Sequence, residues 1–140
     1  MSVMNFKVRR IEAERKDTTA KSIEVKSNFA ILTLEKKKDK LVGDYIEAKF
    51  KFDAEYTPTV GSLKFEGSVW YQHPNLKEVA VEDGKRIRLK SEAVEELSNA
   101  ILRECLIEAF GTAKTIGLPM PMKMPSVKVN KDDVPFSKAA

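Results

Sequence analysis

Residues 45–56 have the sequence YIEAKFKFDAEY, and their pattern is the strongest indication of the fold. Apolar side chains recur at every second position of this stretch: Ile46, Ala48, Phe50, Phe52, Ala54 and Tyr56. The positions between them are mostly charged: Tyr45, Glu47, Lys49, Lys51, Asp53 and Glu55. A period of two is typical of a β-strand, and a division into a dry and a wet face is typical of antiparallel sheets. The stretch therefore predicts a long antiparallel strand with one buried face.

A second alternating stretch follows after a turn. Residues 57–61 include Pro58 and Gly61, which are typical turn residues. The side chains that we expect to face inward are Leu63, Phe65, Gly67, Val69 and Tyr71. Those that we expect to face outward are Lys64, Glu66, Ser68 and Trp70. The two stretches together predict a β-hairpin.

Two further strands are predicted before this hairpin. Residues 4–11 alternate in the same way, and residues 29–35 are a dense run of apolar and β-branched residues. A polar connection over residues 12–28 joins them. The charged run at residues 36–40 interrupts the second of these strands, and we interpret it as a solvated hairpin tip. The pattern over about residues 4–72 predicts a meander of about four antiparallel strands.

A long amphipathic helix is predicted over about residues 91–115. Ser91 is a candidate N-cap, and Gly117 followed by Pro119 is a natural stop. Apolar residues recur at spacings of three and four: Val94, Leu97, Ile101, Cys105 and Ala109. A second line widens the apolar arc: Leu102, Leu106 and Phe110. Either the helix packs deeply in its own domain, or the second line contacts another subunit, and the pattern leaves both open.

The remaining segments are less regular. Residues 76–90 are mixed, with Glu82–Lys85 as a tight turn. Over residues 117–130 the prolines exclude a helix and favour an extended chain, in which three methionines alternate: Met120, Met122 and Met124. Methionine adapts to irregular apolar partners. These side chains therefore either cover the protein's own core or line a site for varied client peptides.

Length and composition describe one ordinary domain. A chain of 140 residues is close to the commonest domain size, so we expect a single domain over residues 1–140. The net charge of +4 permits contact with nucleic acid or acidic proteins without requiring it. No apolar run approaches the roughly 20 residues that cross a bilayer, and the first residues lack a signal-peptide core. We therefore expect a cytoplasmic protein without membrane insertion, and its single cysteine, Cys105, agrees with a reducing compartment.

The sequence lacks the motifs of most enzymes. Its one histidine, His73, precedes a proline in a turn, and Cys105 lies on the apolar stripe as a small hydrophobic residue. No second histidine or cysteine completes a zinc site, and neither a phosphate-binding glycine loop nor a nucleophile elbow is present. We predict no enzyme activity, metal or cofactor. The outward Trp70 is a candidate interaction anchor, unless the segment after residue 74 covers it.

The basic side chains leave nucleic acid as an alternative partner. Residues 36–40 concentrate positive charge, but lysines 49, 51 and 64 share the wet face with carboxylates, which oppose a phosphate track. A nucleic-acid surface would also interleave aromatic side chains for base stacking. A nucleic-acid or ribosome-associated binding module is therefore the second hypothesis.

The order of these parts resembles the SecB export-chaperone family. Residues 6–11, FKVRRI, are similar to the family's first strand, and the hairpin over residues 44–71 resembles its paired long strands. Arg103-Glu104-Cys105 and the Gly-Pro break after residue 116 resemble the family's main helix and its exit. The resemblance spans most of residues 4–130. It implies an α+β fold, with a four-stranded antiparallel sheet and a long helix packed on one face.

The resemblance also implies a function and an assembly. It implies an ATP-independent holdase that binds unfolded or export-bound polypeptides, assembled as a dimer or a dimer of dimers with the long helix at subunit contacts. The residues predicted for the oligomer interface are Ile101, Arg103, Cys105 and Leu106. The residues predicted for client binding are Leu118, Met120, Met122 and Met124, together with Trp70. A chaperone dedicated to one partner, such as an antitoxin, is the further alternative with the same fold.

Overall fold

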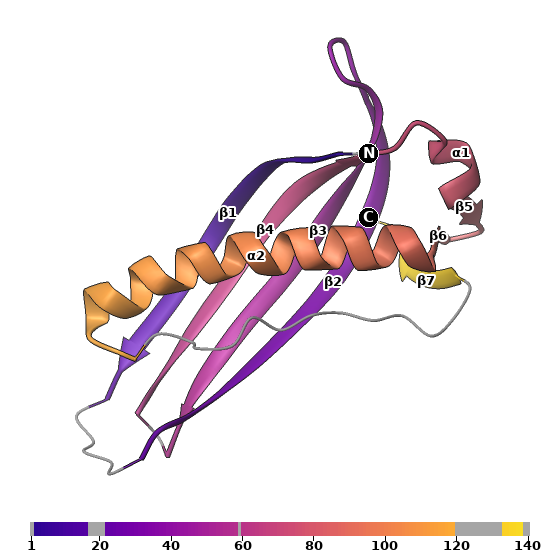
Figure 1. Cartoon of the computed structure of the whole chain (residues 1–140). Helices are drawn as coiled ribbons and strands as arrows, with labels where there is room; N and C mark the ends of the chain where they lie inside the picture. The colour runs from indigo at the N-terminus through magenta and orange to yellow at the C-terminus, as the bar shows by residue number, and fades with distance from the viewer. Residues whose placement is uncertain (1, 17–21, 59, 120–132, 139–140) are drawn as a thin grey trace.

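The computed structural model describes residues 2–16, 22–58, 60–119 and 133–138, and Figure 1 shows its arrangement. The larger sheet contains four antiparallel strands in the order β1-β4-β3-β2. The strands are β1 (Ser2–Arg15), β2 (Glu24–Asp39), β3 (Gly43–Thr57) and β4 (Gly61–Gln72). The long helix α2 (Ser91–Ile116) lies across one face of this sheet (Figure 1). The predicted α+β fold is therefore confirmed.

A smaller sheet lies near the start of α2. Its order is β5-β6-β7, and a short helix precedes it. These elements are α1 (Leu76–Val79), β5 (Ala80–Asp83), β6 (Arg86–Lys90) and β7 (Asp133–Ser137). The predicted tight turn at Glu82–Lys85 joins β5 to β6, where Asp83 pairs with Arg86. The sequence did not predict the strands themselves, because four or five residues are too few to show a period.

The hairpin of β3 and β4 supplies most of the core. Its register runs from the pair Ile46–Tyr71 to the pair Tyr56–Gly61. The predicted inward side chains of both strands are buried, and the rings of Phe52 and Phe65 stack with centroids 6.0 Å apart. Full burial of one such aromatic side chain contributes about 1.5–3 kcal/mol. The alternation therefore identified the buried face of both strands correctly.

The predicted meander is wrong in one respect, because β1 pairs with β4 and lies at the opposite edge from β2. Val3 pairs with Tyr71 and Ile11 with Phe65, with register shifts between these pairs. Gly67 permits this pairing. A Cβ atom at this position would overlap the carbonyl oxygen of Lys7 and lie 2.9 Å from Phe50 Cζ. The period of a strand shows which face is buried but not which strand lies beside it.

The wet face of the hairpin is drier than predicted at one end. Tyr45, Glu47 and Ser68 were expected to face solvent, yet all three are buried. The ring of Trp70 stacks on that of Tyr45 with centroids 4.1 Å apart, and the Lys37 ammonium lies 3.6 Å from a Glu47 carboxylate oxygen. Neighbouring side chains on the same face therefore help to shield Tyr45 and Glu47 from water.

The charged run at residues 36–40 is mostly strand, which corrects the prediction of a hairpin tip. β2 continues to Asp39, and Lys37 pairs with Tyr45. The turn itself is short, because the Asp39 carboxylate accepts hydrogen bonds from the backbone N–H groups of Leu41 (2.8 Å) and Val42 (3.1 Å). Lysines 36 and 38 consequently project from one side of the strand and Lys37 from the other.

Helix α2 has the predicted length and stop. It ends at Gly117, whose φ of +74° is left-handed, and the Leu118 N–H donates to the Ala113 carbonyl at 2.8 Å. Ser91 is the first helical residue, and Lys90 is the N-cap without a side-chain hydrogen bond, so the predicted cap is wrong. Both apolar lines except Phe110 are buried against the sheet, because α2 packs on β1 and β4. This places the helix deep in its own domain.

Candidate polypeptide-binding surfaces

The exit of α2 is fixed to the far end of the sheet. Leu118 is buried, and its two methyl carbons lie 3.1 Å from the place that a Cβ on Gly61 would take. The Tyr56 hydroxyl donates a 2.6 Å hydrogen bond to the Pro119 carbonyl. Burial raises the pKa of Tyr56, so this hydroxyl keeps its proton at neutral pH. The chain therefore leaves the helix from an anchored position.

The residues predicted for client binding do not form one site among the described residues. Leu118 packs on the helix side of the sheet, near the β3–β4 turn. Trp70 is half-buried on the opposite face, where it stacks on Tyr45 and pairs across the strands with Glu47. The three methionines of the prediction, at positions 120, 122 and 124, lie outside the described residues.

The residues predicted for the oligomer interface divide into two groups. Ile101, Cys105 and Leu106 are buried within the chain's own core, whereas Arg103 is exposed on the outer side of α2. Burial, with a smaller contribution from the neighbouring glutamates, raises the pKa of the Cys105 thiol to about 12. The thiol is therefore un-ionised at neutral pH, as expected of a small hydrophobic residue.

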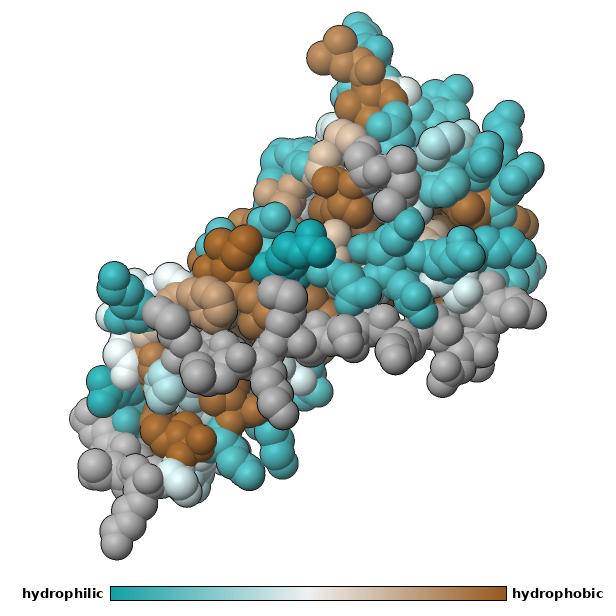
Figure 2. All heavy atoms as spheres, viewed as in Figure 1, coloured by the Kyte–Doolittle hydropathy of each residue, from teal (hydrophilic) through white to brown (hydrophobic). Residues whose placement is uncertain are grey.

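Among the residues that the structure describes, large apolar side chains are exposed on the helix side of the molecule, and sequence reasoning missed two of those considered below. Ile107 and Phe110 lie on α2 with 56% and 38% of their surface exposed, and Ile11 lies on the edge strand β1 with 52% exposed. Figure 2 shows brown side chains that reach the surface along α2 and at the end of the sheet near the helix exit. Ile107 is an apolar residue outside both apolar lines of the helix, and this position could have predicted its exposure from the sequence.

Neither a metal site nor a membrane-spanning helix is present among the residues that the structure describes. There, no group of three or more histidine, cysteine or acidic side chains is arranged to hold a metal ion. None of the described helices is long and apolar enough to cross a membrane.

Comparisons with known proteins define the class of fold. No family model matches the chain, and no curated protein matches it in sequence. In structure, the four-stranded antiparallel sheet with one long helix is the fold of a SecB-like chaperone. One matching structure is the Mycobacterium tuberculosis Rv1957 SecB-like chaperone in complex with a ChAD peptide from the Rv1956 HigA1 antitoxin. The TM-score is 0.56 at 10% sequence identity, over 91% of this chain and 89% of that chain.

Proposed function

We propose that this protein is a cytoplasmic chaperone without enzyme activity, which binds unfolded or export-bound polypeptides through apolar surfaces and needs no ATP. The observation that carries the proposal is the fold shared with a SecB-like chaperone that was solved with a bound peptide. Exposed apolar side chains on the helix side of the sheet support it. Burial of apolar area is non-directional, so such a surface accepts many sequences and requires no cofactor.

The free energy gained by covering the exposed apolar side chains can be compared with the free energy that client binding requires. Ile11, Ile107 and Phe110 are each about half exposed, so covering all three yields roughly 3–4 kcal/mol. A micromolar dissociation constant corresponds to about 8.2 kcal/mol. We therefore propose that the methionines at 120, 122 and 124 supply much of the remainder, next to the anchored Leu118.

A chaperone dedicated to one partner is the second candidate. It is favoured by the antitoxin peptide bound to the matching structure. The fold and the apolar surface serve both candidates equally, and only the range of clients separates them. We also propose that the protein assembles as a dimer or a dimer of dimers in which Arg103 of α2 lies at a subunit contact. Replacing Arg103 by Glu should then lower the mass measured by light scattering.

The test is suppression of aggregation. The purified protein is mixed, without nucleotide, with several unrelated chemically unfolded clients on dilution, and light scattering is followed. Suppression of every client at near-stoichiometric amounts is expected of a general chaperone. Suppression of none would remove the general function and leave a fold that serves either one dedicated protein partner or RNA.

Variants locate the surface that acts in this assay. Replacing Met120, Met122 and Met124 together by Ser should weaken capture, and so should the pair Ile107→Ser and Phe110→Ser. The matched control is the pair Leu41→Ser and Val81→Ser, which removes exposed apolar side chains from the hairpin tip and β5. Equal capture by all of these variants would contradict the proposed surface.

A further inference from the structure

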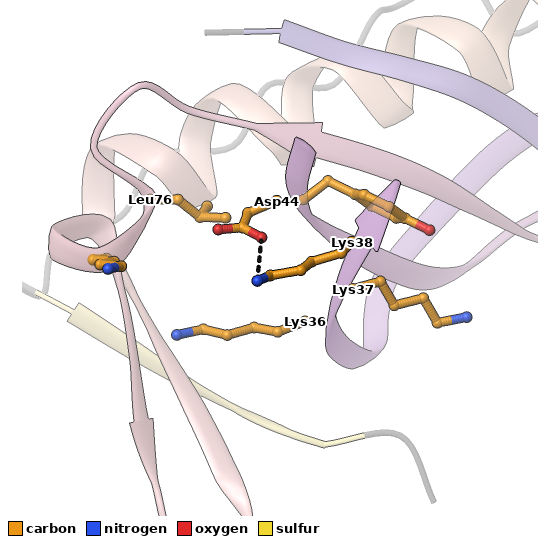
Figure 3. Close-up of a pocket in the computed structure, with 7 residues that line it drawn as sticks. Lys36, Lys37, Lys38, Asp44 and Leu76 are labelled. Carbon is orange, nitrogen blue, oxygen red and sulfur yellow. Dashed lines mark ion pairs between the residues drawn. The ribbon is translucent and has the colours of Figure 1, made fainter. Parts of the chain in front are cut away.

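A pocket with a positive rim lies between the end of the β2–β3 hairpin and the short helix α1. Its volume is about 310 Å³. The residues that line it are Lys36, Lys37, Lys38, Asp44, Tyr45, Leu76 and Lys77. Figure 3 shows the side chains of Lys36 and Lys38 on the same side of the strand as Leu76, whereas Lys37 points away. The pocket thus receives two ammonium groups from β2, and Leu76 and Lys77 from α1.

The charges around this pocket are unequally matched. Lys38 lies 4.0 Å from Asp44, and Lys37 is paired on the other side of the strand with Glu47. Within the described residues, neither Lys36 nor Lys77 has a carboxylate within ion-pair distance. The Glu82 carboxylate is already paired with Lys138 at 2.9 Å, and this pairing, with a smaller contribution from Lys36, lowers its pKa. The pocket therefore carries a surplus of positive charge.

The walls of the pocket indicate the chemistry of its ligand. Leu76 is half-buried, and the aliphatic stems of the lysines add apolar surface below their ammonium groups. Ammonium groups on flexible stems attract any carboxylate, and they lack the fixed donors that select one small molecule. Stacking of a nucleic-acid base is disfavoured, because the ring of Tyr45 is only 5% exposed and already stacks on Trp70.

We propose that this pocket binds an acidic segment of a polypeptide partner. One apolar side chain of the segment packs against Leu76, and neighbouring carboxylates pair with Lys36 and Lys77. A cavity of this size is at the lower end of the range for ligand sites and holds one large side chain. The inference rests on the proposed function, since it assigns a second contact to the polypeptides that the protein binds.

The experiment measures fluorescence anisotropy with three labelled probes. These are a short peptide of alternating Glu and Leu, the same peptide with Gln in place of Glu, and an oligouridylate. The pair Lys36→Gln and Lys77→Gln should weaken binding of the acidic peptide by roughly tenfold, since two exposed charge pairs are lost. The control pair Lys51→Gln and Lys64→Gln removes the same charge from the opposite face of the sheet and should leave binding unchanged.

The outcomes separate this proposal from the chaperone function. Tighter binding of the acidic peptide than of the neutral one, lost only in the Lys36 and Lys77 variant, supports the pocket. Equal binding of both peptides overturns the pocket while the apolar chaperone surface stands. Failure to bind either peptide contradicts both. Tighter binding of oligouridylate than of the acidic peptide, lost in the same variant, assigns the pocket to RNA and overturns the proposal.

Discussion

Replacement of Gly67 by Ala tests the position of β1, on which the whole sheet order depends. A methyl group at Gly67 would overlap the backbone carbonyl oxygen of Lys7. The neighbouring strand must retreat by about 1 Å before this contact reaches the 3.0 Å that real Cβ atoms keep. The contact is with backbone, so no side-chain rotation relieves it. A shift away from Lys7 is also opposed, because Phe50 Cζ would lie only 2.9 Å from the added methyl carbon.

These contacts allow the loss of stability caused by Gly67→Ala to be estimated. Overpacking costs about 1–3 kcal/mol, and a lost ladder hydrogen bond adds about 1 kcal/mol. Ala also lowers the conformational entropy of the unfolded chain relative to Gly, which offsets about 0.4–1 kcal/mol of this destabilisation. We therefore expect Gly67→Ala to lower the free energy of unfolding by about 2–3 kcal/mol, measured by urea titration at fixed protein concentration.

Gly111 provides the matched control for this substitution. It lies on the exposed side of α2, and a Cβ atom there would meet nothing within 4 Å. Since Ala is a better helix former than Gly by about 0.8–1 kcal/mol, Gly111→Ala should raise the free energy of unfolding by that amount. If Gly67→Ala unfolded at the same urea concentration as the parent while Gly111→Ala unfolded at a higher one, β1 would not lie against β4 in this register.

Two further predictions concern single side chains. Tyr56→Phe removes the hydrogen bond to the Pro119 carbonyl and should lower the free energy of unfolding by about 1 kcal/mol in the same urea titration. The control Tyr45→Phe removes no such bond and should leave the free energy of unfolding unchanged. Equal effects of the two substitutions would contradict the anchor. Burial raises the pKa of Cys105 from 9.0 to about 12, so its thiol ionises at a lower pH in the unfolded chain than in the folded protein. The free energy of unfolding should therefore fall as pH rises between these values, by up to about 1.4 kcal/mol per pH unit. Cys105→Ala should remove this part of the slope, and rapid maleimide labelling of the folded protein at neutral pH would refute the burial.

The elements that the sequence predicted best are those whose environment repeats along the chain. Over residues 45–56 every second side chain packs in the same core, so the alternation of apolar and polar residues alone identifies the buried face. Helix α2 ends where Gly117 can adopt a positive φ, which is a local requirement as well. Patterns of this kind depend on the residues themselves and on no distant partner.

The elements that were missed depend on contacts between distant segments. The pairing of β1 with β4 joins Ile11 to Phe65, and alternation is the same whichever neighbour a strand has. Gly67 was the one local signal, because a glycine within a strand often marks a close approach of backbone. β7 pairs with β6 across more than forty residues of chain, and Pro135 within it obscured its strand character. The lysine pocket likewise needs Lys36 and Lys77 from elements far apart in the sequence.

The two proposed contact sites lie toward opposite ends of α2. The helix has 26 residues and is about 39 Å long, and its exit leads to Leu118, while α1 and the lysine pocket lie near its start. An extended segment needs about a dozen residues, at about 3.3 Å each, to reach from one site to the other. Under the proposed chaperone function, unfolded clients in general would use the apolar surface alone. A partner with carboxylates placed a dozen residues from its apolar anchor gains the second contact without a second association cost. If both proposals hold, the protein would bind many clients weakly through the apolar surface and one acidic partner tightly through both sites.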